Sequence, residues 1–173
     1  LRRAAAPVVT ARADEPANGG DITRVLVPTD GSEAADAAVD HALAVADACG
    51  AALRVLSVVD TRALAAQPDL APSDAVIENL EERSEHAVNE VAERCEEAGL
   101  SVETVVARGA PSRAICEDAD ESGADLVAMG THGRSGLDRV LLGSVAERLV
   151  RTAPVPVLTV RGATDGDGDG DGS

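Results

Sequence analysis

Short aliphatic runs alternate with longer segments of helical periodicity along most of the chain, and this alternation constrains the fold more than any other feature. The runs, rich in Val, Leu and Ile, cover residues 22–28, 52–59, 102–107, 126–129 and 155–160. Helical spacing of apolar residues covers 34–49, 73–98 and 145–151, and a further helix is expected from Pro111 onward. Strands separated by helices pair in parallel and need cover on both faces. The sequence therefore predicts one α/β domain with a doubly wound parallel sheet.

Serine, glycine and proline mark the expected ends of these helices. Ser32 follows a Thr-Asp-Gly turn and can accept a hydrogen bond from the first turn of the next helix. Gly50 and Gly99 follow the first two helices, because glycine adopts a left-handed backbone without strain. Pro111 suits a first helical turn, where an N–H group is not needed.

The core has to be built without aromatic side chains, because the chain contains no Phe, Trp or Tyr. Hydrophobic residues still make up 45% of the 173 residues, which is enough for one domain. The branched aliphatic side chains that remain suit strands buried on both faces.

The chain is strongly acidic, with 31 Asp and Glu residues against 15 basic residues, all of them Arg, and a net charge of −16. Such a surface repels phosphate backbones, and the missing aromatics remove the usual stacking platform for single strands. We therefore expect no nucleic-acid partner. Our hypothesis for the acidity is a halophilic host with a salt-rich cytoplasm, where screening makes like charge tolerable. The alternative is an ordinary acidic protein from a GC-rich genome.

The two ends of the chain differ from the part between them. Residues 1–21 are rich in Ala, Arg, Gly and Pro without periodicity, which predicts a disordered extension. Residues 162–173 contain alternating Asp and Gly, which predicts a flexible acidic tail. The domain itself is expected over residues 22–161.

Targeting and cysteine patterns favour a cytoplasmic protein. The apolar stretch near the start is short and is cut by Pro7, so it makes a poor secretory signal. No apolar run reaches the length of a membrane span. Cys49, Cys95 and Cys116 form no CxxC pair, and we expect reduced, mostly structural thiols.

A glycine-rich loop follows the run at 126–129. Gly130, Gly133, Gly143 and Ser144 give the spacing Gly-x2-Gly-x9-Gly-Ser, and the last two residues stand at the start of a helical segment. Glycines let a backbone approach a phosphate closely, and the free N–H groups of a helix start attract an anion. The pattern predicts a phosphate site. The structural alternative is that Gly130 and Gly133 only make a turn and that Gly143 is a packing residue.

This loop resembles the ATP-binding signature of the universal stress protein family. Three other segments agree with the resemblance, and they cover residues 27–32, 109–111 and 155–160. The resemblance extends over about residues 21–161. It implies a five-stranded parallel sheet in the order 3-2-1-4-5 and a homodimer formed by antiparallel pairing of the last strand, at residues 155–160. Such pairing would also cover an apolar edge strand.

The resemblance also implies a set of residues that bind ATP. Adenine and ribose would be held at Pro28, Thr29, Asp30 and Val58. Ribose and the first phosphates would be held by Met129, Gly130, Thr131, His132, Gly133 and Arg134, and the outer phosphates by Gly143, Ser144 and Val145. Arg139 is a second cation that could neutralise phosphate, and the alternative is that it is a solvated surface arginine. Mg²⁺ would arrive with the nucleotide, bound mostly by phosphate and water.

Rival sites are weaker. A P-loop needs a lysine, which the chain lacks. Asp165, Asp167 and Asp169 begin a calcium-loop pattern that lacks its closing glutamate, and we predict no metal site. His41 and His86 fit helix surfaces, and no Gly-x-Ser-x-Gly elbow accompanies His132.

Two functions therefore remain open. The favoured one is an ATP-binding stress-response protein that acts as a nucleotide-dependent dimeric switch or chaperone, with no catalytic residue. The alternative is slow ATP hydrolysis or self-phosphorylation, with a bound water or Ser144 as the phosphate acceptor. Turnover by the purified protein separates the two.

Overall fold

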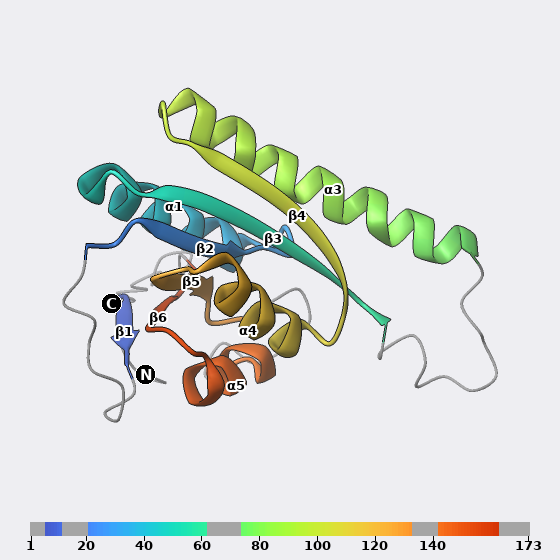
Figure 1. Ribbon diagram of the computed structural model, residues 1–173. Helices are drawn as coiled ribbons and strands as arrows, with labels where there is room; N and C mark the ends of the chain where they lie inside the picture. The colour runs from blue at the N-terminus through green and yellow to red at the C-terminus, as the bar shows by residue number, and fades with distance from the viewer. Residues whose placement is uncertain (1–5, 12–20, 62–73, 133–141, 163–173) are drawn as a thin grey trace, which may run out of the picture.

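The computed structural model describes residues 6–11, 21–61, 74–132 and 142–162, in which one mixed sheet lies between two layers of helices (Figure 1). The strands are β1 (Val8–Thr10), β2 (Arg24–Pro28), β3 (Ala52–Asp60), β4 (Val102–Gly109), β5 (Leu126–Gly130) and β6 (Val157–Val160). The helices are α1 (Glu33–Cys49), α3 (Asp74–Glu97), α4 (Pro111–Ser122) and α5 (Ser144–Thr152). The strands and helices expected from the sequence are all present.

The strand order is β1-β6-β5-β2-β3-β4. Strands β2 to β6 pair in parallel, and their order is the one expected from the sequence. The prediction of a five-stranded, wholly parallel sheet is wrong in one respect, because a sixth strand, β1, pairs antiparallel with β6. The prediction of disorder over 1–21 is accordingly wrong for Val8–Thr10. The physical reason is that β6 offers an edge of backbone groups that need partners.

The outer edge of β6 therefore has a partner from the same chain. The sequence leads us to expect pairing of residues 155–160 with a second copy, whereas the structure pairs Val157 with Thr10 and Thr159 with Val8. The homodimer stays a prediction, and it requires β1 to leave this edge.

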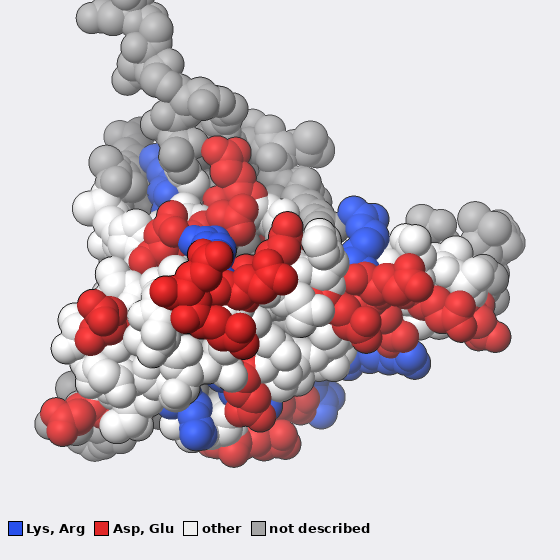
Figure 2. Space-filling model, turned by 90° about the horizontal axis from the view of Figure 1, so that it is seen from above, with Lys and Arg blue, Asp and Glu red and all other residues white. Residues whose placement is uncertain are grey.

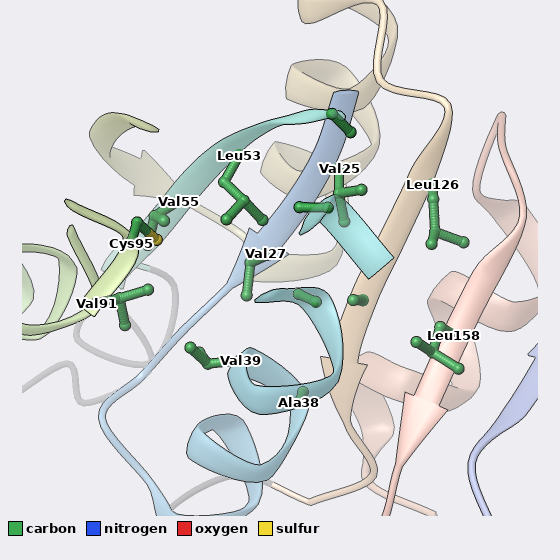
Figure 3. Close-up of a cluster of buried hydrophobic side chains, with 14 of the residues drawn as sticks. Val25, Val27, Ala38, Val39, Leu53, Val55, Val91, Cys95, Leu126 and Leu158 are labelled. Carbon is green, nitrogen blue, oxygen red and sulfur yellow. The ribbon is translucent and has the colours of Figure 1, made fainter. Parts of the chain in front are cut away.

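Helices α1 and α3 cover one face of the sheet, and α4 and α5 cover the other (Figure 1). Figure 3 shows the cluster under α1 and α3, in which aliphatic side chains from α1, α3 and four strands meet. Helix α1 turns alanines toward the sheet, and Ala38, Ala42 and Ala46 are completely buried. Short side chains let this helix lie close to β2 and β5.

The residues predicted to begin and end the helices do so in the structure. The Ser32 hydroxyl oxygen accepts a hydrogen bond from the Ala35 N–H group at 3.3 Å. Gly50 ends α1 with a φ of 67°, in the left-handed region that favours glycine. Pro111 stands in the first turn of α4.

Asp125 ties the amino ends of β2 and β5 together. Its Oδ2 atom accepts hydrogen bonds from the Thr23 N–H group at 2.8 Å, the Thr23 hydroxyl at 2.9 Å and the Arg24 N–H group at 3.0 Å. Burial disfavours the charged carboxylate, but these hydrogen bonds and the nearby Arg24 charge outweigh it and lower the pKa of Asp125. The carboxylate is therefore held in its ionised form.

On the face seen in Figure 2, acidic side chains cover more of the surface than arginines do. Helices α1 and α3 expose a series of them, namely Glu33, Asp36, Asp40, Asp47, Glu78, Glu82, Glu85, Glu90, Glu93, Glu96 and Glu97. Some arginines are already committed to ion pairs. The Arg54 guanidinium donates to both carboxylate oxygens of Asp118, at 2.8 and 2.7 Å. None of the helices in the described ranges is long and apolar enough to cross a membrane.

Replacing Asp125 by Asn should lower the free energy of unfolding by about 1 kcal/mol at neutral pH, because the substitution removes charge-assisted hydrogen bonds at a partly exposed site. A group whose pKa is lowered by folding stabilises the protein above its unfolded pKa, and the effect disappears as the pH falls through the folded pKa. The gap between wild type and variant should therefore be constant from about pH 5 to 7 and close below about pH 4. Denaturant unfolding across this pH range measures the difference.

Asp120→Asn, at an exposed position, is the matched control. A difference in the free energy of unfolding that does not depend on pH would contradict the role of the Asp125 carboxylate.

Raising KCl from about 0.1 M to 1 M should raise the thermal midpoint by several degrees, because the Debye length shortens from about 10 Å to 3 Å and repulsion among the exposed carboxylates weakens. Differential scanning calorimetry measures the midpoint, and an uncharged osmolyte at equal osmolarity is the control. A midpoint indifferent to KCl would contradict the salt-rich-host hypothesis.

Candidate functional site

The loops after β2 and β5 leave the sheet side by side at its carboxyl edge. Strand β2 is paired with β3 on one side and with β5 on the other. After β2 the chain enters α1 on one face, and beyond β5 it enters α5 on the opposite face. In open α/β sheets, ligands bind where consecutive connections diverge in this way.

We call the space expected between these two loops the crevice, and the turn after β2 would form its first wall. The Thr29 N–H group donates to the Leu56 carbonyl at 2.9 Å, and the Thr29 hydroxyl oxygen accepts from the Gly31 N–H group at 3.1 Å. Asp30 Oδ1 accepts from the Ser32 N–H group at 3.1 Å. The Thr29 N–H group is therefore already used in the sheet. Pro28, which ends β2, is partly buried beside this turn.

The second wall is the chain after β5. The Thr131 N–H group donates to the Val160 carbonyl at 2.8 Å, and the Thr131 carbonyl accepts from the Gly143 N–H group at 2.7 Å. The Thr131 hydroxyl lies 2.9 Å from His132 Nδ1. The other ring nitrogen of His132, Nε2, is buried and has no hydrogen-bond partner among the described residues. A buried polar atom without a partner is uncommon in folded proteins.

Helix α5 begins at this wall without a side-chain cap. Gly143 occupies the N-cap position and makes no side-chain hydrogen bond to the helix, unlike Ser32 at α1. The Gly143 carbonyl accepts from the Glu147 N–H group, while the first-turn N–H groups before it have no partner within the helix. Ser144 is exposed and Val145 is partly buried. These N–H groups and the positive end of the helix dipole suit an anion.

Two glycines of the predicted loop also have packing roles. A Cβ atom on Gly130 would lie 2.5 Å from the Ala34 carbonyl oxygen, so glycine is required where β5 meets the first turn of α1. A Cβ on Gly143 would lie 3.0 Å from the Thr131 carbonyl oxygen, which is a tighter contact than most side chains make. Packing thus accounts for Gly130 by itself. Gly162 also lies against Ala34. Our sequence analysis did not identify Ala34 as a contact residue, because an alanine in an alanine-rich helix gives little signal.

The remaining predicted residues are less directly placed. Met129 is only 6% exposed and its side chain belongs to the core under α4 and α5, so it can offer only backbone groups to a ligand. Val58 lies on β3, next to β2, and its side chain packs against the same core. Gly133, Arg134 and Arg139 lie outside the described residues.

Other candidate chemistry lies away from the crevice. A groove of about 240 Å³ borders Gly31 and α3, and it contains no residue of the predicted ATP site. His41 and His86 lie on helix surfaces, as predicted, with His86 3.5 Å from Glu90. The three cysteines are free thiols. The described ranges contain no group of three or more His, Cys, Asp or Glu side chains that could hold a metal ion.

Known proteins share both the sequence pattern and this fold. The universal stress protein MJ0531 of Methanocaldococcus jannaschii is 37% identical over 138 residues, which are 80% of this chain and 81% of that protein. The solved structure of MJ0577, from the same organism, has a TM-score of 0.74 at 27% identity and covers 84% of this chain and 100% of its own. A universal stress protein crystallised in complex with cAMP has a TM-score of 0.61 at 30% identity, with coverage of 83% and 100%.

The profile of the universal stress protein family matches residues 21–161, the segment that runs from the start of β2 through β6 and contains both walls of the crevice. Strand β1 lies outside this segment. On the strength of this match and of the relatives above, the chain belongs to the universal stress protein family.

Proposed function

We propose that this protein binds an adenine nucleotide, ATP together with Mg²⁺, in the crevice between the loops after β2 and β5. The observation that carries the proposal is the uncapped start of α5, which a 2.7 Å hydrogen bond from Gly143 to Thr131 holds at the carboxyl edge of the sheet. A relative at 30% identity crystallised with cAMP supports an adenine nucleotide as the ligand.

The phosphates would lie at the start of α5. The N–H groups of Ser144 and Val145 would donate to phosphate there, and the Ser144 hydroxyl would add another donor. Glycine at position 143 avoids the tight contact, at 3.0 Å, that a Cβ atom would make with the Thr131 carbonyl oxygen. Gly133 and Arg134 remain part of the proposal from the sequence, with Arg134 and Arg139 as cations for phosphate.

The nucleoside would lie between the two walls. Asp30 and the Thr29 carbonyl would bind ribose or adenine, with Pro28 and the backbone of Val58 beside them. The backbone from Met129 to His132 would line the opposite side, where His132 Nε2 would gain a partner in a ligand oxygen. The described residues hold no carboxylate cluster for a metal, so Mg²⁺ would be bound mostly by phosphate and water, where it neutralises phosphate charge.

Nucleotide binding of this kind stabilises the folded state by mass action, so ATP can act as a signal that changes the stability and contacts of a cytoplasmic stress protein. We assign no catalytic residue. Within the described residues, no observation favours hydrolysis or transfer of phosphate to Ser144 over simple binding.

Gly143→Asp should weaken the binding of Mg-ATP at least about 100-fold, because the aspartate places a Cβ 3.0 Å from the Thr131 carbonyl oxygen and a negative charge where phosphate would bind. Isothermal titration in about 1 M KCl, where surface repulsion is screened, measures the affinity. ATP, AMP and cAMP are compared in the same way, and phosphate release is followed in parallel to detect turnover.

Asn89→Asp is the matched control, because it adds the same charge at an exposed position of α3 with almost no change of side-chain shape. This variant should bind ATP like wild type. Equal affinity in wild type and Gly143→Asp would show that the start of α5 does not hold phosphate. Absence of binding to folded wild type would overturn the proposed function as a whole.

A further inference from the structure

The outer edge of β6 is covered by a segment that is not part of the family domain. Strand β1 ends before residue 21, where the family match begins, yet it completes the sheet on the side of β6. The register places Val8 opposite Thr159 and Thr10 opposite Val157. Two side-chain hydrogen bonds reinforce it, because Thr10 Oγ1 donates to the Val157 carbonyl and Thr159 Oγ1 donates to the Val8 carbonyl, each at 3.2 Å.

The backbone groups of β6 form hydrogen bonds on two sides, toward β5 and toward β1. The carbonyls of Pro156 and Val160 accept hydrogen bonds from the β5 side, whereas the Val157 carbonyl faces β1. All four residues of β6 are buried while β1 is in place. Without β1, this aliphatic strand would present unpaired backbone groups to its surroundings, and such an edge is a template for another strand.

Strand β1 is itself held lightly. It contains three residues, and the Val9 side chain between the two threonine contacts is 60% exposed. Its advantage over a second molecule is that it belongs to the same chain. A tethered segment acts at an effective concentration on the order of millimolar, well above the micromolar concentration of another copy.

We propose that β1 is an intramolecular cap that keeps the chain monomeric by occupying the edge of β6, and that release of β1 opens this edge to antiparallel pairing with β6 of a second copy. The occupant of the open edge is a second copy because a strand that pairs with itself about a two-fold axis satisfies both edges at once. The proposal is independent of nucleotide binding, since none of its contacts involves the crevice.

Thr10→Pro tests the cap, because proline removes both the backbone N–H group and the hydroxyl that donates to Val157. Removal of residues 1–11 is the second variant, and Val9→Thr, at the exposed position, is the matched control. Sedimentation equilibrium without nucleotide, from about 1 to 100 µM protein in about 1 M KCl to screen the net charge, gives the oligomeric state. Wild type and Val9→Thr should be monomers, and both cap variants should form dimers whose dissociation constant lies in this range.

Hydrogen exchange at the amides of Val157 and Thr159 provides a second measurement. These amides should be protected in wild type at every concentration, and in the truncated chain they should become protected only as dimers form. A dimeric wild type, including one that exchanges β1 between copies, would overturn the proposal. So would a folded, monomeric truncated chain whose β6 amides stay as protected as those of wild type.

Discussion

Close approach between α1 and the sheet is the constraint on which the rest of the structure depends. Without aromatic side chains, the core can fill its volume only if the layers lie near each other, and the completely buried alanines of α1 allow this. Gly130 and Gly162 continue the same contact at the first turn of α1, against Ala34. This contact brings the carboxyl ends of β5 and β6 to the start of α1. The packing that compensates for small side chains is thus also what assembles both walls of the crevice.

An acidic protein that binds an anionic ligand faces an electrostatic conflict, and the geometry of the crevice reduces it. Under the proposed function, the donors for phosphate in the described part of the crevice are backbone N–H groups at the start of α5. Such dipoles add no net charge and act over short distances. Salt that screens the surface carboxylates leaves these close contacts largely intact. Binding of nucleotide and a strongly acidic exterior are therefore compatible.

Much of the fold could be predicted because its signals are local. Glycine after α1, at Gly50, and proline in the first turn of α4, at Pro111, fix helix ends from the sequence alone. Strand β1 could not be predicted, because Val8–Thr10 is a short run whose partner lies almost at the other end of the chain. The glycine spacing predicted a phosphate site after β5, but it could not reveal that Gly130 is required by its contact with Ala34. Local patterns therefore predict elements, and long-range contacts decide what each residue does.

The position of β1 outside the family domain has a consequence for how such a protein can evolve. Residues 21–161 carry both walls of the crevice, so substitutions there are constrained by packing and, under the proposed function, also by the nucleotide. Val8 and Thr10 meet only the requirements of an edge strand, and three residues can be lost, strengthened or replaced by few mutations. Lineages that share this domain can consequently diverge in quaternary structure while the ligand site stays under separate selection.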